Sequence, residues 1–542
     1  MPEAHDRPTL AKALIAGLEA RGIDTVFGIP GVHTIALYGG LENSGLRHVT
    51  PRHEQGSGFM ADGYARAVGK PAACFIITGP GMTNIATAMA QARADSVPML
   101  VIGSVQKTAE LGLRQGRLHE LPDQQATLAG VAAFSHRLLA ADNLFEVLDR
   151  AFAVFAAERP GPAYIEIPRD LFDAPVTVAD RPPSRLYRAA PDPAGIQAAA
   201  DALNAAERPL LLLGGGAIAE PDAIRALAER LDTPTLTTIN ARGVLGRGHP
   251  LDLGANASWP AVRRHAHEAD VILAIGTELG ETDYDVVFDG GFVLAGTLIH
   301  IDLDPAQLAG AYPVAIGLVS DAASAARALT PKIADRPRGG AARVAALYAE
   351  MNLTERADLA PFVSFFDAIE RAAPNAVLVG DSTAPVYAGN VLVHCAQPRH
   401  WFNSSTGYGT LGYALPAAIG AKRARPDQHV ITLVGDGGLM FTIAELATAV
   451  DEDLPITVIV WHNQGYEEIR RSMDDAEVSR CGVDIAAPDF QTLAAGFGIP
   501  GTRVADATAL QQALRDGPGL QLIEVDAGAW PKTAQLSKLF TH

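Results

Sequence analysis

The feature that most constrains the fold is the alternation of two hydrophobic patterns along this chain of 542 residues. Short apolar runs, such as DTVFGIP (24–30), PLLLLGGG (209–216) and ITVIVWHN (456–463), are separated by segments whose apolar residues recur at helical spacing. Strands that alternate with helices indicate βαβ units around parallel sheets. The sequence therefore predicts an α/β protein with doubly wound parallel sheets.

The length predicts several domains, because a single hydrophobic core seldom serves more than about 250–300 residues. Two polar segments rich in proline, at 180–193 and 331–343, are typical of linkers. We therefore expect three α/β domains and a tail. Their predicted ranges are 1–180, 190–335, 357–530 and, for the tail, 531–542.

Composition excludes several classes of function. The chain has 43 basic and 61 acidic residues, a net charge of -18, and no run of Lys and Arg typical of nucleic-acid or anionic-membrane binding. Its three cysteines, Cys74, Cys395 and Cys481, lack the spacing of a disulfide framework or a metal site. The N-terminal segment lacks the apolar core of a signal peptide, so we expect a soluble, cytoplasmic protein.

One stretch, 429–466, combines two apolar runs with polar residues directly after each. HVITLV is followed by GDGG, MFTIAELATAV (440–450) has helical spacing, and ITVIVW is followed by HNQGY. A right-handed crossover would bring Asp436 and Asn463, 27 positions apart, to the carboxyl ends of parallel strands, where open α/β sheets bind ligands. Their oxygens suit Mg²⁺, which commonly bridges a carboxylate and a diphosphate. Each feature alone is also compatible with an ordinary turn or loop.

These residues resemble the thiamine diphosphate motif of the pyruvate oxidase and decarboxylase superfamily, which begins with GDG and closes with an asparagine after about this interval. The resemblance extends over nearly the whole chain. Its further motifs are VFGIPG (26–31), RHEQGSGFMADGYAR (52–66), TGPGMTN (78–84), GPAYIEIPRD (161–170) and GYGTLGYALPAAIGAKRARP (407–426). It implies an N-terminal domain that binds the pyrimidine, a mainly structural central domain, and a C-terminal domain that binds diphosphate and Mg²⁺.

The resemblance also implies a cofactor site. Asp436, Asn463 and the backbone carbonyl of Gly465 correspond to the magnesium ligands of the family. Position 462, often a second asparagine, is His here, which leaves the ligand at 463 in place. The residues that correspond to diphosphate contacts are Gly435, Gly437, Gly438, Ser382 and Thr383.

Two further residues correspond to positions that act on the cofactor itself. Glu54 matches the glutamate that shares a proton with the aminopyrimidine ring, and Leu411 matches the bulky residue that holds the cofactor bent. Glu54 is also compatible with a simple first-turn carboxylate, and Leu411 with a core leucine. In the family this glutamate and the diphosphate site come from different subunits, so we expect a homodimer or homotetramer.

The implied reaction is addition of the cofactor to a 2-oxo acid, loss of carbon dioxide and formation of an enamine. Candidates to face the substrate are His33, where benzaldehyde lyase has a histidine, and Gln115 or Gln124, in the segment that supplies a glutamine in that lyase and in acetohydroxyacid synthase. A surface position is the alternative for all three. Glu467 and Glu468 are candidates to meet a cationic substrate tail, or part of a solvated helix face.

Protonation of the enamine would release an aldehyde, whereas a second carbonyl would give a hydroxyketone. GDSTAP (380–385) and Leu411 favour a decarboxylase or lyase over acetolactate synthesis, so we expect a decarboxylase, with a carboligase as the alternative. A nucleotide-binding oxidoreductase is a rival of another class, because Gly214, Gly216 and Ala219 match a dinucleotide fingerprint. FAD binds the central domain in some members of the family, but no residue here indicates it. Glu54, Asp436 and Asn463 argue against a protein without catalytic activity.

Overall fold

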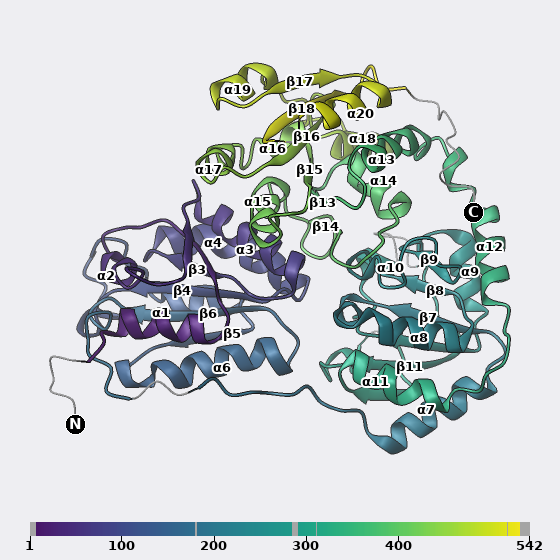
Figure 1. Cartoon of the computed structure of the whole chain (residues 1–542), viewed down its shortest axis with the longest axis horizontal. Helices are drawn as coiled ribbons and strands as arrows, with labels where there is room; N and C mark the ends of the chain where they lie inside the picture. Colours follow the sequence, from purple (N-terminus) through teal and green to yellow (C-terminus); the bar gives the residue numbers. More distant parts are fainter. Residues whose placement is uncertain (1–6, 179–181, 285–290, 311, 518, 532–542) are drawn as a thin grey trace. The chain divides into compact units, whose positions relative to one another are not determined.

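The structure is a computed structural model, and it describes residues 7–178, 182–284, 291–310, 312–517 and 519–531. All but the first residue of the predicted tail, 531–542, lies outside these ranges. The chain forms two compact units (Figure 1). Unit 1 contains Met1–Tyr187, Gly412–Asp427 and Met440–Ile456, and unit 2 contains Arg188–Leu411, Gln428–Leu439 and Thr457–His542.

Three parallel six-stranded sheets confirm the predicted fold class. The first sheet has the order β2-β1-β3-β4-β6-β5 and the third has the order β14-β13-β15-β16-β18-β17. Numbered within its own sheet, each runs 2-1-3-4-6-5, so these two parts of the chain share one topology. The predicted domain boundaries stay predictions, although 182–192, within the first predicted linker, has no regular structure.

The first sheet lies in unit 1, with α1 and α6 on one face and α3 and α4 on the other (Figure 1). Its strands are β1 (Thr25–Gly28), β2 (Arg47–Val49), β3 (Ala73–Ile76), β4 (Met99–Val105), β5 (Phe134–Arg137) and β6 (Pro162–Pro168). Its helices are α1 (Leu10–Ala20), α2 (Ile35–Gly39), α3 (Glu54–Val68), α4 (Pro80–Ala94), α5 (Gln124–Ala129) and α6 (Leu144–Ala157).

The second sheet lies in unit 2 and has the order β12-β11-β10-β7-β8-β9, which is the strand order of a dinucleotide-binding fold. Its strands are β7 (Pro209–Leu213), β8 (Thr235–Thr237), β9 (Asp252–Gly254), β10 (Val271–Ile275), β11 (Thr297–Asp302) and β12 (Ile316–Val319). Its helices are α7 (Pro193–Ala205), α8 (Pro221–Leu231), α9 (Pro260–His267), α10 (Glu281–Tyr284), α11 (Ala322–Leu329) and α12 (Gly340–Met351).

The glycine-rich turn after β7 packs against the neighbouring loop. The N–H of Gly214 donates to the carbonyl of Ile275 and the N–H of Gly216 donates to that of Gly276, both at 3.0 Å. A Cβ on Gly216 would lie 2.9 Å from the Cα of Gly276. Contact between two loops therefore accounts for these glycines, and the fingerprint gives no separate support to an oxidoreductase.

The third sheet carries the motif of 429–466. Its strands are β13 (Val377–Gly380), β14 (Trp401–Asn403), β15 (Val430–Gly435), β16 (Ile456–His462), β17 (Gly501–Val504) and β18 (Gln521–Asp526). The helices of unit 2 in this part of the chain are α13 (Ala360–Ala372), α14 (Ala384–Leu392), α16 (Asp436–Leu439), α18 (Glu467–Asp475), α19 (Phe490–Gly496) and α20 (Ala507–Asp516). Two further helices, α15 (Ala414–Ala424) and α17 (Glu445–Asp451), belong to unit 1. The helix expected over 440–450 begins only at Glu445, because 440–444 forms turns.

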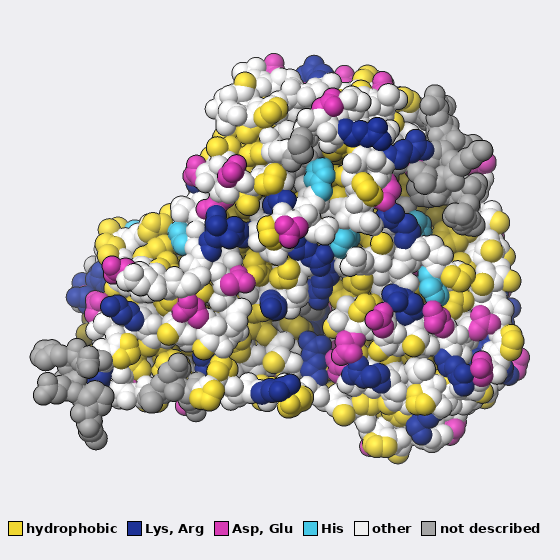
Figure 2. Space-filling view, viewed as in Figure 1, with side chains coloured by type: hydrophobic (Ala, Val, Ile, Leu, Met, Phe, Trp, Pro, Cys, Tyr) yellow, Lys and Arg dark blue, Asp and Glu magenta, His cyan; other side chains and the backbone are white. Residues whose placement is uncertain are grey.

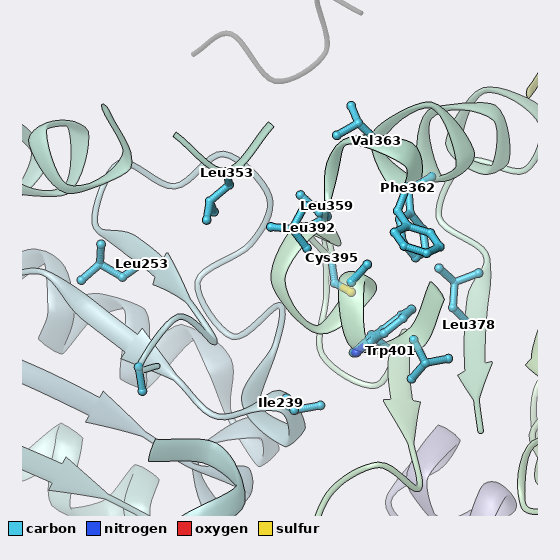
Figure 3. Close-up of a cluster of buried hydrophobic side chains, with 14 of the residues drawn as sticks. Ile239, Leu253, Leu353, Leu359, Phe362, Val363, Leu378, Leu392, Cys395 and Trp401 are labelled. Atoms are coloured by element: carbon cyan, nitrogen blue, oxygen red, sulfur yellow. The ribbon is translucent and has the colours of Figure 1, made fainter. Parts of the chain in front are cut away.

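One hydrophobic core joins the second and third sheets within unit 2. Ile239 and Leu253 contribute from the second sheet's side, and Phe362, Leu378 and Trp401 from α13, β13 and β14 (Figure 3). The surface is mixed, with acidic, basic and single hydrophobic side chains scattered over the face drawn in Figure 2. None of the helices in the described ranges has the length and hydrophobicity needed to cross a bilayer.

In unit 1, helices α3 and α15 pack with backbone against backbone. A Cβ on Gly63 would overlap the carbonyl oxygen of Ala417, and one on Gly420 would overlap that of Met60. Neither oxygen belongs to a flexible side chain that can move aside. Small residues therefore set the distance between α15 and α3, the helix that begins at Glu54.

Replacing Gly420 with Ala should separate these helices. We expect the free energy of unfolding to fall by about 1–3 kcal/mol or more, because overpacking forces the backbone to shift. Gly130→Ala is the matched control, since a Cβ there meets nothing within 4 Å. Equal urea denaturation midpoints for the two variants would contradict the close approach.

Candidate active site

Asp436 and Asn463 lie side by side at the carboxyl edge of the third sheet. Asp436 follows the last residue of β15 and Asn463 the last residue of β16, and these strands are neighbours. One terminal atom of the Asn463 amide lies 3.2 Å from Asp436 Oδ1 and 2.9 Å from the carbonyl oxygen of Gly465. The crossover predicted from the sequence thus brings the three expected metal ligands together.

The chemistry of this cluster fits a hard cation. If the amide nitrogen of Asn463 occupies the shared position, it donates to both neighbouring oxygens. If the amide oxygen occupies it, three oxygens converge, which requires a cation between them and is the donor type that Mg²⁺ prefers. In the described residues, no group of three His, Cys, Asp or Glu side chains is arranged to hold a metal ion, so a cation here would also need the amide of Asn463 and the carbonyl of Gly465.

Asp436 is buried and is held by the backbone around it. Its Oδ1 accepts from the N–H of Gly437 at 2.7 Å, and its Oδ2 accepts from the N–H groups of Gln464 at 2.6 Å and Gly465 at 3.2 Å. Burial raises the pKa of Asp436 above its ordinary value, although these bonds partly oppose the effect. A divalent cation would offset that cost by favouring the carboxylate.

His462, which stands where the family often has asparagine, is oriented by a carboxylate. Its Nδ1 lies 2.7 Å from Glu524 Oε1, and its Nε2 lies 3.9 Å from Asp436 Oδ2. Glu524 also accepts from Gln491 at 3.0 Å and pairs with Arg503 at 2.8 Å. Burial alone would raise the pKa of Glu524, but these three partners hold it below its ordinary value.

The predicted diphosphate residues surround the same edge. A Cβ on Gly435 would lie 3.0 Å from Thr383 Oγ1, and one on Gly438 would lie 3.4 Å from Oδ2 of buried Asp381. At Gly437 the close neighbour is the Tyr466 ring, which a Cβ would approach to 2.6 Å. The Tyr466 ring therefore leaves no room for a side chain at position 437, with or without a bound ligand.

Ser382 and Thr383 lie beside this edge, next to Asp381 and Gly435. The N–H of Ser382 donates to Asp381 Oδ1 at 2.8 Å, and Thr383 precedes α14 without capping it through its side chain. Leu411 is half-buried, directly before Gly412. Their roles toward a cofactor stay predictions.

Glu54 occupies the first position of α3 in unit 1. His53 caps this helix by accepting from the N–H of Gln55 at 3.1 Å. Glu54 Oε2 accepts from Asn84 Nδ2 at 2.9 Å, and a Cβ on Gly81 would lie 3.3 Å from Oε1. Asn84 therefore orients the carboxylate and occupies one of its oxygens.

His33 is buried beside a second histidine. Its ring centroid lies 5.3 Å from that of His119, and its Nδ1 has no hydrogen-bond partner in the described structure. His119 Nδ1 lies 3.0 Å from the carbonyl oxygen of Thr78. Burial lowers the pKa of His33, helped by the charges of Arg169 and His119 and opposed by Glu110. A neutral imidazole whose Nδ1 has no hydrogen-bond partner retains the capacity to bond to a ligand.

The two candidate glutamines differ in environment. Gln115 is exposed, and its side-chain oxygen accepts from Arg117 at 2.9 Å. Gln124 is fully buried, where its oxygen accepts from the N–H of Gly79 at 2.8 Å and its nitrogen contacts Ser104, Tyr164 and Glu166 at 2.9 to 3.1 Å. The amide of Gln124 thus links Gly79 to β4 and β6 of the first sheet, and a role of either glutamine toward substrate stays a prediction.

Glu467 and Glu468 engage arginines of their own helix. Glu467 pairs with Arg470 and Glu468 with Arg471, three residues further along α18. Such pairs on a surface helix agree with the solvated face considered as the alternative.

The sequence motifs did not identify Asn84, His119 or Glu445 as parts of these arrangements. Asn84 closes the motif TGPGMTN, so its position was available as a signal. His119 stands between the two glutamines in a loop without periodicity, and Glu445 lies on a short helix whose partners are distant in sequence. Only the fold brings His119 and Glu445 to their neighbours.

Comparisons with known proteins match most of the chain. Family models described as the N-terminal, central and C-terminal domains of thiamine pyrophosphate enzymes match residues 8–127, 196–329 and 381–525. The chain is similar to the probable 2-ketoarginine decarboxylase AruI of Pseudomonas aeruginosa, with 44% identity over 95% of this chain and 94% of that protein. It is also similar to the acetolactate synthase isozyme 1 large subunit of Escherichia coli, with 33% identity over 96% and 94%, and to the acetolactate synthase large subunit of Corynebacterium glutamicum, with 32% identity over 97% and 89%.

Proposed function

Because the chain belongs to the family of thiamine pyrophosphate enzymes, we propose that it decarboxylates a 2-oxo acid with thiamine diphosphate and Mg²⁺ and releases an aldehyde. The observation that carries the proposal is the similarity to a probable 2-ketoarginine decarboxylase, at 44% identity along nearly the whole chain. A 2-oxo acid with a guanidinium tail is therefore the first substrate to test.

The residues proposed to hold the cofactor come from two parts of the chain. We assign the pyrimidine to 1–180 and the diphosphate and Mg²⁺ to 357–530, with 190–335 as the central domain. Asp436, Asn463 and the carbonyl of Gly465 would bind Mg²⁺, and the grouping of Asp436 Oδ1 and the Gly465 carbonyl around the Asn463 amide supports this assignment. Gly435, Gly437, Gly438, Ser382 and Thr383 would face the diphosphate, and Leu411 would support the bent cofactor.

Thiamine diphosphate, when bound, supplies the nucleophilic carbon and the electron sink of the decarboxylation. Glu54 would exchange a proton with the aminopyrimidine ring through Oε1, since Asn84 occupies Oε2. Asn84 would thereby fix which oxygen faces the ring. His33 would contact the substrate through its imidazole ring, whose buried Nδ1 has no hydrogen-bond partner in the described structure.

We further propose a cytoplasmic homodimer or homotetramer in which Glu54 of one protomer serves the diphosphate site of its partner. Met440 and Phe441, which follow the GDGG motif, are 44% and 55% exposed, and large apolar side chains at such a position favour burial by another subunit. All three cysteines are free and Cys481 is exposed, which suits a reducing compartment.

A carboligase is the second candidate, because acetolactate synthases match nearly the whole chain at 32–33% identity. The two reactions share every step up to loss of carbon dioxide. They differ in whether a proton or a second carbonyl compound is then added.

The test is a product assay by mass spectrometry on the full chain with Mg²⁺ and thiamine diphosphate. The substrates are pyruvate, benzoylformate and 5-guanidino-2-oxopentanoate, each with and without an aldehyde acceptor. We expect aldehyde and carbon dioxide from the guanidino acid without an acceptor. Acetolactate or a hydroxyketone as the main product would replace the decarboxylase by the carboligase.

A further inference from the structure

A carboxylate outside the proposed cofactor contacts holds the chain directly before Glu54. Glu445 is the first residue of α17, and both its oxygens lie 3.1 Å from the N–H of Arg52. Its Oε1 also accepts from the N–H of His53 at 3.1 Å. The carboxylate therefore binds the two residues that lead into α3.

The environment of Glu445 shows that this arrangement is specific. Its side chain is 1% exposed, although an unpaired carboxylate is costly to bury. Burial raises its pKa, while the hydroxyl of Thr448, which donates to Oε2 at 2.7 Å, and the two N–H groups oppose that effect. Every partner is a donor, so both oxygens must act as acceptors.

Gly56 makes room for this carboxylate. A Cβ at position 56 would overlap Oε1 of Glu445, while the other helix partners of α3 lie further along it. The first turn of α3 is therefore shaped around Glu445. Because Glu54 is the first residue of that turn, any shift of residues 52–56 moves its carboxylate.

We propose that Glu445 is a positioning residue, which fixes Glu54 against the pyrimidine ring by binding the backbone of Arg52 and His53. The inference rests on the proposed function, because it assigns Glu445 a role through Glu54. Its consequence is that Glu445 affects the tautomer of the bound cofactor without touching the cofactor.

Glu445→Gln tests the proposal in the full chain loaded with Mg²⁺ and thiamine diphosphate. The amide keeps the shape but loses the negative charge, and it places a donor NH2 group at one of the two positions that now accept from Thr448 or from the backbone N–H groups. We expect kcat to fall about 10- to 100-fold with KM nearly unchanged, as for a small misplacement of a reacting group. We also expect the near-UV circular dichroism of the bound cofactor to change toward that of Glu54→Gln.

Gly56→Ala perturbs the same contact from within α3, because the new Cβ would displace the carboxylate end of the Glu445 side chain. We expect the same loss of kcat and the same spectral change, and little further loss when both substitutions are combined, because they break one contact. Asp62→Asn is the matched control. Asp62 is a fully buried carboxylate on the same helix, bound to Arg66 at 2.6 Å, so its loss should lower stability and leave the cofactor spectrum unchanged.

A cofactor spectrum that is unchanged in Glu445→Gln, or changed equally in Asp62→Asn, would overturn the proposal. Additive effects of Glu445→Gln and Gly56→Ala would overturn it as well. The spectrum needs no substrate. A wild-type protein that turns over none of the 2-oxo acids would thus reject the proposed function and leave the test of Glu445 in place.

Discussion

Replacement of Glu54 by Gln is expected to lower kcat about 10²- to 10⁴-fold, the range lost when a positioned acid or base is removed. Glutamine keeps the size of the side chain and can still accept from Asn84, but it cannot exchange a proton with the aminopyrimidine ring. The loss should appear in carbon dioxide release at saturating substrate and cofactor.

The fold should survive this change, because the Glu54 side chain is only half-buried and its one described hydrogen bond is retained. Glu42→Gln makes the same chemical change at an exposed position of unit 1 and should keep wild-type turnover. If Glu54→Gln retained near wild-type kcat, the proposed proton exchange would be wrong.

Replacement of Asp436 by Ala is expected to weaken the binding of thiamine diphosphate by at least about 100-fold, because loss of a residue that only supports a metal ligand already costs about 10- to 100-fold and Asp436 is proposed as a ligand itself. The change removes the only charged member of the three-ligand cluster and an acceptor for three backbone N–H groups. Titration calorimetry in the presence of Mg²⁺ measures this affinity directly.

Two further variants distinguish loss of the metal site from local unfolding as the cause of weaker cofactor binding. Asp436→Asn retains the shape and one acceptor oxygen but loses the charge, so it should also bind the cofactor weakly. Asp489→Ala removes another carboxylate of unit 2 that accepts from backbone N–H groups, those of Gln491 and Thr492. It should leave the affinity unchanged. Unaltered affinity in Asp436→Ala would exclude this residue from the metal site.

The apolar runs singled out in the sequence are strands, whereas the three-residue strands were missed. β7, β15 and β16 have five to seven residues and read as apolar runs because both faces of each are covered. β2, β8, β9 and β14 have three residues each, too few for any period to show. These segments are strands because they pair with neighbouring strands, and the local sequence does not show that pairing.

The same limit applies to the candidate site. The meeting of Asp436 and Asn463 followed from crossover geometry, because parallel neighbours end at one edge. The choice between Gln115 and Gln124 did not, since burial and hydrogen bonding distinguish them and neither is visible in the loop sequence. The pairing of His33 with His119 likewise required the fold, because they lie 86 positions apart in the chain.

The division of the chain into two units has a spectroscopic consequence. All four tryptophans, Trp259, Trp401, Trp461 and Trp530, belong to unit 2, and Trp461 lies two residues before Asn463. Intrinsic tryptophan emission therefore follows unit 2 alone, whereas far-ultraviolet ellipticity follows the helices of both units. Coincident denaturation curves from the two signals would mean that the units unfold as one cooperative system, and separate curves would give each unit its own stability.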